Sequence, residues 1–125
     1  MKNEKICLIS PRVLGSSGQV RKAPPPFGIA TLAASLIEIG YKNVQLIDAV
    51  VEDYNNIEPV EDSKIFTTYG LSDKAMVKMV KDINPDFIGI SALFSSQTEC
   101  AFSVAKILKE ELPNIPIAMG GNHAT

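Results

Sequence analysis

The sequence predicts an α/β domain in which helices pack on both faces of one parallel, doubly wound β-sheet. Short apolar runs alternate with segments of helical periodicity along the whole chain, and Pro, Gly or Asn separates them. The resulting order, βαβαβαβ, requires parallel strands joined by right-handed crossovers. The 125 residues suffice for one such domain, which we expect to cover residues 1–125.

The first strand and the first helix are separated by a long loop. Residues 6–9 form an apolar run that ends at Ser10-Pro11. The sequence Gly15-Ser16-Ser17-Gly18 lacks the lysine of a P-loop, and we interpret it as part of a mobile loop. The prolines at 24–26 are typical of a helix start, and Gly40 is typical of its end. The apolar face of this helix comprises Ile29, Leu32, Ala33, Leu36 and Ile37.

The second strand and second helix flank a segment with no clear period. Residues 44–47 form the strand, which runs into Asp48. We expect an irregular excursion over residues 51–70, whose acidic side chains form a solvated loop. The second helix has Ser72 as its N-cap and stops at Asn84-Pro85. Its apolar stripe comprises Met76, Met79, Val80 and Ile83.

The third strand, third helix and fourth strand complete the series. Residues 87–90 are nearly all apolar, which is typical of a strand covered on both faces. Ser96 and Glu99 have the spacing of a capping box, and the helix ends before Pro113. Its buried positions are Ala101, Val104, Ala105, Leu108 and Leu112. The fourth strand, residues 115–119, leads directly into Gly120-Gly121.

No helix follows the fourth strand. We therefore expect the sheet to be truncated before a fifth strand, with the chain forming the N-terminal fragment of a longer protein. The unpaired sheet edge would then favour self-association.

Composition argues against several classes of function. The net charge is −2 and no Lys/Arg block is present, so neither nucleic acid nor a membrane is an expected partner. No export segment is recognisable, and a cytoplasmic location is expected. Cys7 and Cys100 are expected to be buried, reduced thiols rather than metal ligands. No nucleophile–base pair is visible, so no catalytic residue is predicted.

The sheet topology indicates where a ligand would bind. In open α/β sheets, ligands bind beyond the carboxyl ends of the strands, where the strand order reverses. With a flavodoxin-like order, second–first–third–fourth, the loops at 10–23, 91–96 and 120–125 meet at that point. Ser91 can donate a hydrogen bond there, and the start of the third helix at Ser95 and Ser96 offers backbone N–H groups. Taken alone, however, these serines more often only cap the helix or bond to backbone.

The other polar candidates at this edge are weaker. Gly120-Gly121 allows either close approach of a bulky ligand to the backbone or a tight turn. His123, the only histidine, is expected to be a solvated loop residue, and no metal ligand is predicted. Asp48 is placed to accept a hydrogen bond from the ribose hydroxyl of a dinucleotide, but the glycine fingerprint that accompanies this role is missing.

Five segments in order carry a resemblance that covers nearly the whole chain. They are residues 24–29 (PPPFGI), 45–49 (QLIDA), 69–72 (YGLS), 85–91 (PDFIGIS) and 120–125 (GGNHAT). Together they resemble the N-terminal cobalamin-binding domains of cobalamin-dependent radical S-adenosylmethionine enzymes. Cobalamin-binding domains carry Ser-x-Leu after the third strand and Gly-Gly after the fourth. Here these motifs are Ser91-Ala92-Leu93 and Gly120-Gly121.

The resemblance implies a cobalamin site. Ser91 would meet the dimethylbenzimidazole tail, and the two glycines would make room for the nucleotide loop. The cofactor-binding set comprises Ser91, Ala92, Leu93, Ser95, Gly120, Gly121 and Asn122. The wider family's Asp-x-His-x-x-Gly motif, whose histidine binds cobalt, is absent, as it often is in the radical enzymes.

The resemblance also implies a partner outside this chain. The corrinoid would be presented to a C-terminal radical domain of the same polypeptide. That domain would hold S-adenosylmethionine and a [4Fe–4S] cluster, since no CxxxCxxC motif occurs in this chain. Catalysis would therefore belong to the parent enzyme and not to this fragment.

Two other functions stay open. A degenerate domain of the same fold would act as a scaffold or substrate-recognition element without cofactor, and it would share every feature above. A flavodoxin-like nucleotide or signalling domain is the other. The receiver version of this domain needs an acidic pair at the end of the first strand, where this chain has Ile9-Ser10. The flavin version needs a phosphate loop that runs directly into the first helix, and here a proline run interrupts that loop.

Overall fold

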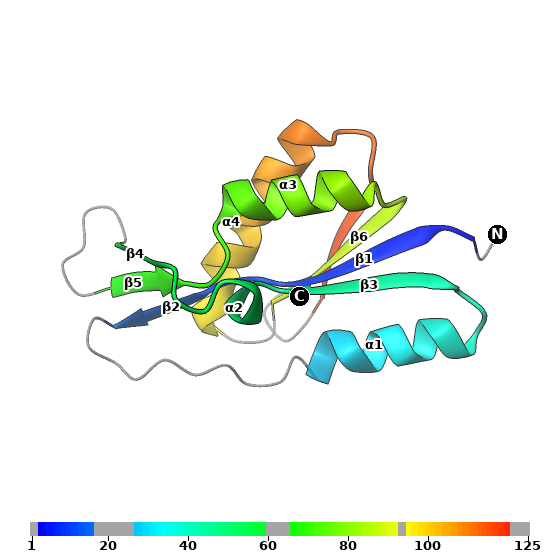
Figure 1. Cartoon of the computed structure of the whole chain (residues 1–125), viewed down its shortest axis with the longest axis horizontal. Helices are drawn as coiled ribbons and strands as arrows, with labels where there is room; N and C mark the ends of the chain where they lie inside the picture. The colour runs from blue at the N-terminus through cyan, green and yellow to red at the C-terminus, as the bar shows by residue number, and fades with distance from the viewer. Residues whose placement is uncertain (1–2, 17–26, 60–65, 93–94, 121–125) are drawn as a thin grey trace.

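The structure is a computed structural model that describes residues 3–16, 27–59, 66–92 and 95–120. Its main sheet has four parallel strands in the order β3-β1-β6-β7 (Figure 1). The strands are β1 (Lys5–Ser10), β3 (Asn43–Asp48), β6 (Phe87–Ser91) and β7 (Ile117–Gly120). The predicted α/β class and flavodoxin-like strand order are therefore confirmed.

The helices lie on both faces of this sheet. Helix α1 (Phe27–Glu38) covers one face, and α3 (Asp73–Ile83) and α4 (Ser95–Glu111) cover the other (Figure 1). Because side chains alternate along a strand, β1 sends Cys7 and Ile9 into the core under α3 and α4. Its other side chains, Ile6 and Leu8, pack with α1. Both faces of β1 are thus buried.

A second, antiparallel sheet was not predicted. It pairs β2 (Val13–Ser16), β5 (Phe66–Tyr69) and β4 (Ile57–Pro59) in the order β2-β5-β4. A short helix, α2 (Ala49–Glu52), precedes it. The prediction of a loop over residues 10–23 and an irregular excursion over residues 51–70 was therefore wrong for these stretches. Strands of three or four residues are too short to show a period, and β2 pairs with β5 across a long sequence separation.

The helix ends follow the predicted capping chemistry. The Ser72 hydroxyl accepts a hydrogen bond from the Ala75 N–H at 3.2 Å and starts α3. Asn84 ends that helix in the left-handed region, with φ of 53°. Gly40, with φ of 111°, lets the Tyr41 N–H donate to the Leu36 carbonyl at 3.0 Å after α1.

Some predicted boundaries and faces were wrong. Helix α4 begins at Ser95, so Ser96 lies inside the helix and not at the N-cap position, and β7 begins at Ile117. On α1, Ile29 and Ala33 are buried, but Leu32 and Ile37 are 49% and 58% exposed.

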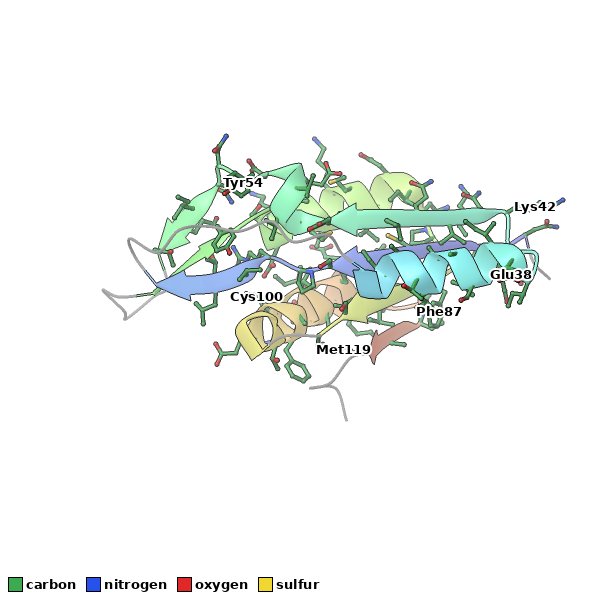
Figure 2. The ribbon with its side chains drawn as sticks, turned by 90° about the horizontal axis from the view of Figure 1, so that it is seen from below. Glu38, Lys42, Tyr54, Phe87, Cys100 and Met119 are labelled. Carbon is green, nitrogen blue, oxygen red and sulfur yellow. The ribbon has the colours of Figure 1, made fainter. Side chains whose placement is uncertain are left out.

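We predicted that both faces of β6 are covered, and this was wrong, because Phe87 is 37% exposed. Among the described residues, α1 lies on that face of the main sheet, over β3 and β1, and β6 and β7 lie beside it (Figure 2). The incomplete cover leaves space beside the helix.

Candidate ligand cavity and ion-pair cluster

A cavity of about 720 Å³ occupies the space beside α1. Its lining comes from α1 on one side and from β1, β6 and β7 beneath (Figure 2). Leu32, the exposed apolar residue of α1, belongs to this lining. The cavity follows the strands from their carboxyl ends, at Ser91 and Gly120, toward their amino ends, at Glu4.

The floor of the cavity is its sheet side, where small residues of β6 and β7 leave space for a ligand. Gly89 pairs with Ala118 in register, and Ser91 pairs with Gly120, and all four line the cavity. The large side chain of Ile88, one position along β6, lies in the opposite core under α3 and α4. The alternation of a β-strand therefore gives β6 one packed face and one face that, after Phe87, carries only Gly89 and Ser91.

Three glycines bring bare backbone to the cavity. A Cβ atom built on Gly28 or Gly120 would meet nothing within 4 Å, so a larger side chain there would extend into open space. A Cβ on Gly89 would lie 2.8 Å from Leu8 Cδ2 and would force that side chain to move. The site thus offers the close approach to backbone that a bulky, extended group such as a nucleotide needs.

The structure brings Ser91 and Gly120, two of the predicted site residues, together. The Ala92 N–H donates to the Gly120 carbonyl at 2.7 Å and extends the pairing past the end of β6. The Ala92 side chain lies in the core under α3 and α4, and does not line the cavity. Ser95 begins α4. The other predicted site residues, Leu93, Gly121 and Asn122, lie outside the described residues, as does His123.

Sequence reasoning missed several residues of this cavity. Gly89, Ala118 and Gly28 were not singled out, although the first two share the strand face of Ser91 and Gly120. The signal was present as small residues at every second position of adjacent strands. It becomes informative only when the pairing of β6 with β7 is known.

Asp48 has a local structural role. Its carboxylate caps α2 by accepting a hydrogen bond from the Val50 N–H at 3.2 Å. Burial raises the pKa of the Asp48 carboxyl, and the N–H groups of Val50 and Val51 act in the opposite direction.

A second polar cluster lies outside the cavity and centres on Arg12. Its guanidinium pairs with the Glu58 carboxylate and lies 3.6 Å from Asp73 Oδ2. Asp73 also accepts a hydrogen bond from the Ser103 hydroxyl at 2.6 Å. These contacts connect β4, α3 and α4 to the segment after β1. The prediction that Glu58 is a solvated loop residue was therefore wrong, because Glu58 takes part in an ion pair.

Arg12 also stands at the histidine position of the missing cobalt-binding motif. Ser10, which ends β1, has with Arg12 and Gly15 the spacing of Asp-x-His-x-x-Gly. The pairing with Glu58 and Asp73 engages the Arg12 side chain in this ion-pair cluster, and Arg12 does not line the cavity.

Both cysteines are buried thiols, as predicted. Burial raises the pKa of Cys7 to about 12. Burial also raises the pKa of Cys100, and the Arg12 guanidinium acts against that rise. Within the described ranges, no group of three His, Cys, Asp or Glu side chains is arranged to hold a metal ion. In the same ranges, no helix has the length and apolar character needed to cross a membrane.

Fold and cavity together define an α/β module whose cavity reaches the carboxyl edge of a parallel sheet, where such folds bind ligands. A model of the B12 binding domain family matches residues 17–125. The chain therefore belongs to the B12 binding domain family. This membership confirms the resemblance to cobalamin-binding domains that the sequence motifs indicated.

Two curated relatives are similar to the chain along nearly its whole length. The cytidylyl-2-hydroxyethylphosphonate methyltransferase of Streptomyces wedmorensis is 34% identical over 121 residues, which cover 97% of this chain and 22% of that protein. An uncharacterized methyltransferase of Pyrococcus horikoshii is 33% identical over 132 aligned positions, covering 100% of this chain and 23% of that protein. The chain thus spans less than a quarter of the length of these relatives. No solved structure matches it.

Proposed function

We propose that this chain binds cobalamin, with the nucleotide tail extended in the cavity beside α1 and the corrin ring at the carboxyl edge of the sheet. The observation that carries the proposal is the bare floor formed by Gly89, Ser91, Ala118 and Gly120 in a member of the B12 binding domain family. The volume of about 720 Å³ lies within the usual range for small-molecule pockets. Its mostly apolar lining suits an aromatic base.

The residues of the chain would hold and orient the cofactor. The Ser91 hydroxyl would donate a hydrogen bond to the tail as it enters, and Gly120 would let the tail pass close to the backbone. Leu93, Gly121 and Asn122 would complete this entrance, and Ser95 would present backbone N–H groups at the start of α4. When bound, the cobalt of the corrinoid would supply the chemistry of methyl transfer.

We further propose that the module presents the corrinoid to a catalytic region of a longer polypeptide. Two relatives with methyltransferase names support this, because each extends far beyond the part that this chain matches. That region would be the radical S-adenosylmethionine domain, holding its [4Fe–4S] cluster, in a cytoplasmic enzyme. Residues 1–125 would then be the cobalamin-binding domain.

Equilibrium dialysis against hydroxocobalamin, read by visible absorbance, tests the binding step. Ser91→Phe and Gly120→Leu each place a large side chain at the entrance of the cavity, and we expect affinity to fall by about tenfold or more. Ala34→Leu is the matched control, because Ala34 is exposed on α1 and does not line the cavity. Far-UV circular dichroism checks that all variants fold.

The outcomes separate the proposal from its main alternative. Failure of the unmodified chain to retain corrinoid would favour a scaffold without cofactor. Unchanged affinity in both entrance variants would show that cobalamin binds elsewhere on the chain.

A further inference from the structure

The far end of the cavity holds a carboxylate oxygen without a partner. Glu4 lines the cavity, and its Oε2 atom is buried with no hydrogen bond to any group of the described chain. The neighbouring carboxylate of Asp86 is already engaged, because its Oδ2 accepts a hydrogen bond from the Lys5 N–H at 2.8 Å. The Lys5 ammonium lies 3.5 Å from the Ile83 carbonyl. Glu4 Oε2 is therefore a buried, unpaired acceptor at this end.

A buried acceptor of this kind has a strong requirement for a donor. Leaving a buried polar atom unpaired costs free energy, and the cost is larger for a charged group. The cavity lining includes apolar groups such as Ile6, Leu36 and Phe87, which cannot donate a hydrogen bond. Tyr41 also lines the cavity, but its hydroxyl makes no hydrogen bond to Glu4 Oε2. A ligand that carries an N–H or O–H group to this point would gain a charge-assisted hydrogen bond.

The position of Glu4 determines which part of a ligand reaches it. Ile9 is level with Ile90, next to Ser91 at the entrance. The five residue steps from Glu4 to Ile9 cover roughly 16 Å, at about 3.3 Å per residue of a parallel strand. A tail that enters beside Ser91 and follows the strands would meet Glu4 with its most distant group. For a corrinoid nucleotide tail, that group is the outer edge of the lower base.

We infer that Glu4 selects corrinoids whose lower base carries a hydrogen-bond donor, a hydroxyl or amino group, on its outer edge. This inference rests on the proposed function. The dimethylbenzimidazole of cobalamin has two methyl groups at that edge and would leave Glu4 unpaired. A hydroxyl in place of a methyl group would pair with Glu4 without a change in ring size.

A matched pair of corrinoids tests the inference with the purified chain. Equilibrium dialysis at pH 7 compares 5-hydroxybenzimidazolyl cobamide with 5-methylbenzimidazolyl cobamide, and cobalamin serves as reference. We expect the hydroxyl compound to bind about tenfold or more tightly than the methyl compound, as for a hydrogen bond to a charged group.

Variants at Glu4 show whether this residue is the cause. Glu4→Leu removes the acceptor and should abolish the preference, whereas Glu4→Gln keeps an acceptor oxygen and should retain part of it. Glu38→Leu is the control, because Glu38 is exposed at the end of α1 and does not line the cavity. Far-UV circular dichroism establishes that each variant is folded.

The possible failures are distinguishable. Equal binding of the two benzimidazolyl compounds, or a preference that Glu4→Leu leaves unchanged, overturns the inference while the proposed function stands. Lack of binding of all three corrinoids overturns both.

Discussion

Replacing Arg12 by methionine tests the ion-pair cluster that joins the antiparallel sheet to α3. The side chain of Arg12 is 17% exposed, and it pairs with Asp73, at 12%, and Glu58, at 42%. Methionine retains apolar length but removes the charge. The substitution leaves the Asp73 carboxylate with the Ser103 hydroxyl as its remaining partner in this cluster.

The expected cost follows from the solvation of the two carboxylates. Removing one partner of a fully buried ion pair costs about 3–5 kcal/mol. The exposure of Glu58 and the position of Asp73 in the first turn of α3 both reduce that cost. We therefore expect a loss of about 2 kcal/mol in the free energy of unfolding. For a domain of this size, this corresponds to a fall in Tm of roughly 6–10 °C.

Urea unfolding followed by far-UV circular dichroism measures this loss, since the chain has no tryptophan. Lys81→Met is the matched control, because it breaks an ion pair with Glu111 in which both side chains are about half exposed. That control should cost no more than about 0.5 kcal/mol. Asp73→Asn should destabilise the Arg12→Met variant less than it destabilises the unmodified chain. Equal costs in both backgrounds, or equal costs for Arg12→Met and Lys81→Met, would refute the reasoning.

Three further predictions concern the thiols, Asp48 and the sheet edge. Because burial raises the pKa of Cys7 from 9.0 to about 12, its thiolate fraction near neutral pH falls roughly a thousandfold; iodoacetamide labelling read by mass spectrometry should modify Cys7 and Cys100 only after urea unfolding, and rapid labelling of the native chain would contradict their burial. The raised pKa of Asp48 makes a stability contribution that is complete below its ordinary value of 3.8 and is lost as the pH rises through the folded-state value. Asp48→Asn should therefore gain stability relative to the unmodified chain between pH 3 and pH 7 in urea unfolding, and a constant difference would argue against the shift. Within the described residues β7 pairs only with β6, so sedimentation velocity should show concentration-dependent self-association through the β7 edge. A chain that stays monomeric at high concentration would contradict this prediction.

The parallel sheet was predictable because its elements carry strong local signals. The apolar runs of β1 and β6 and the periodic face of α3 are visible in isolation. The antiparallel sheet was not predictable, because β2 and β5 are four residues each and lie far apart in the chain. Their pairing depends on tertiary structure and not on local sequence.

The candidate site was predictable in part for a similar reason. Ser91 and Gly120 end neighbouring parallel strands, so topology alone brings them together. The depth of the cavity was not predictable, since it depends on which part of the sheet α1 leaves uncovered. Glu4 was missed because it precedes β1, at the opposite edge from the one where ligands are expected.

The alternation along β6 and β7 makes ligand space and core packing inseparable. A shift of one residue in the register of β6 would turn Ile88 and Ile90 toward α1 and would move Gly89 under α4. That single slip would close the cavity and hollow out the hydrophobic interior at once. Mutations that loosen the pairing of these strands should therefore reduce folding stability and ligand binding together, even when the mutated residue lies outside both the cavity and the hydrophobic core.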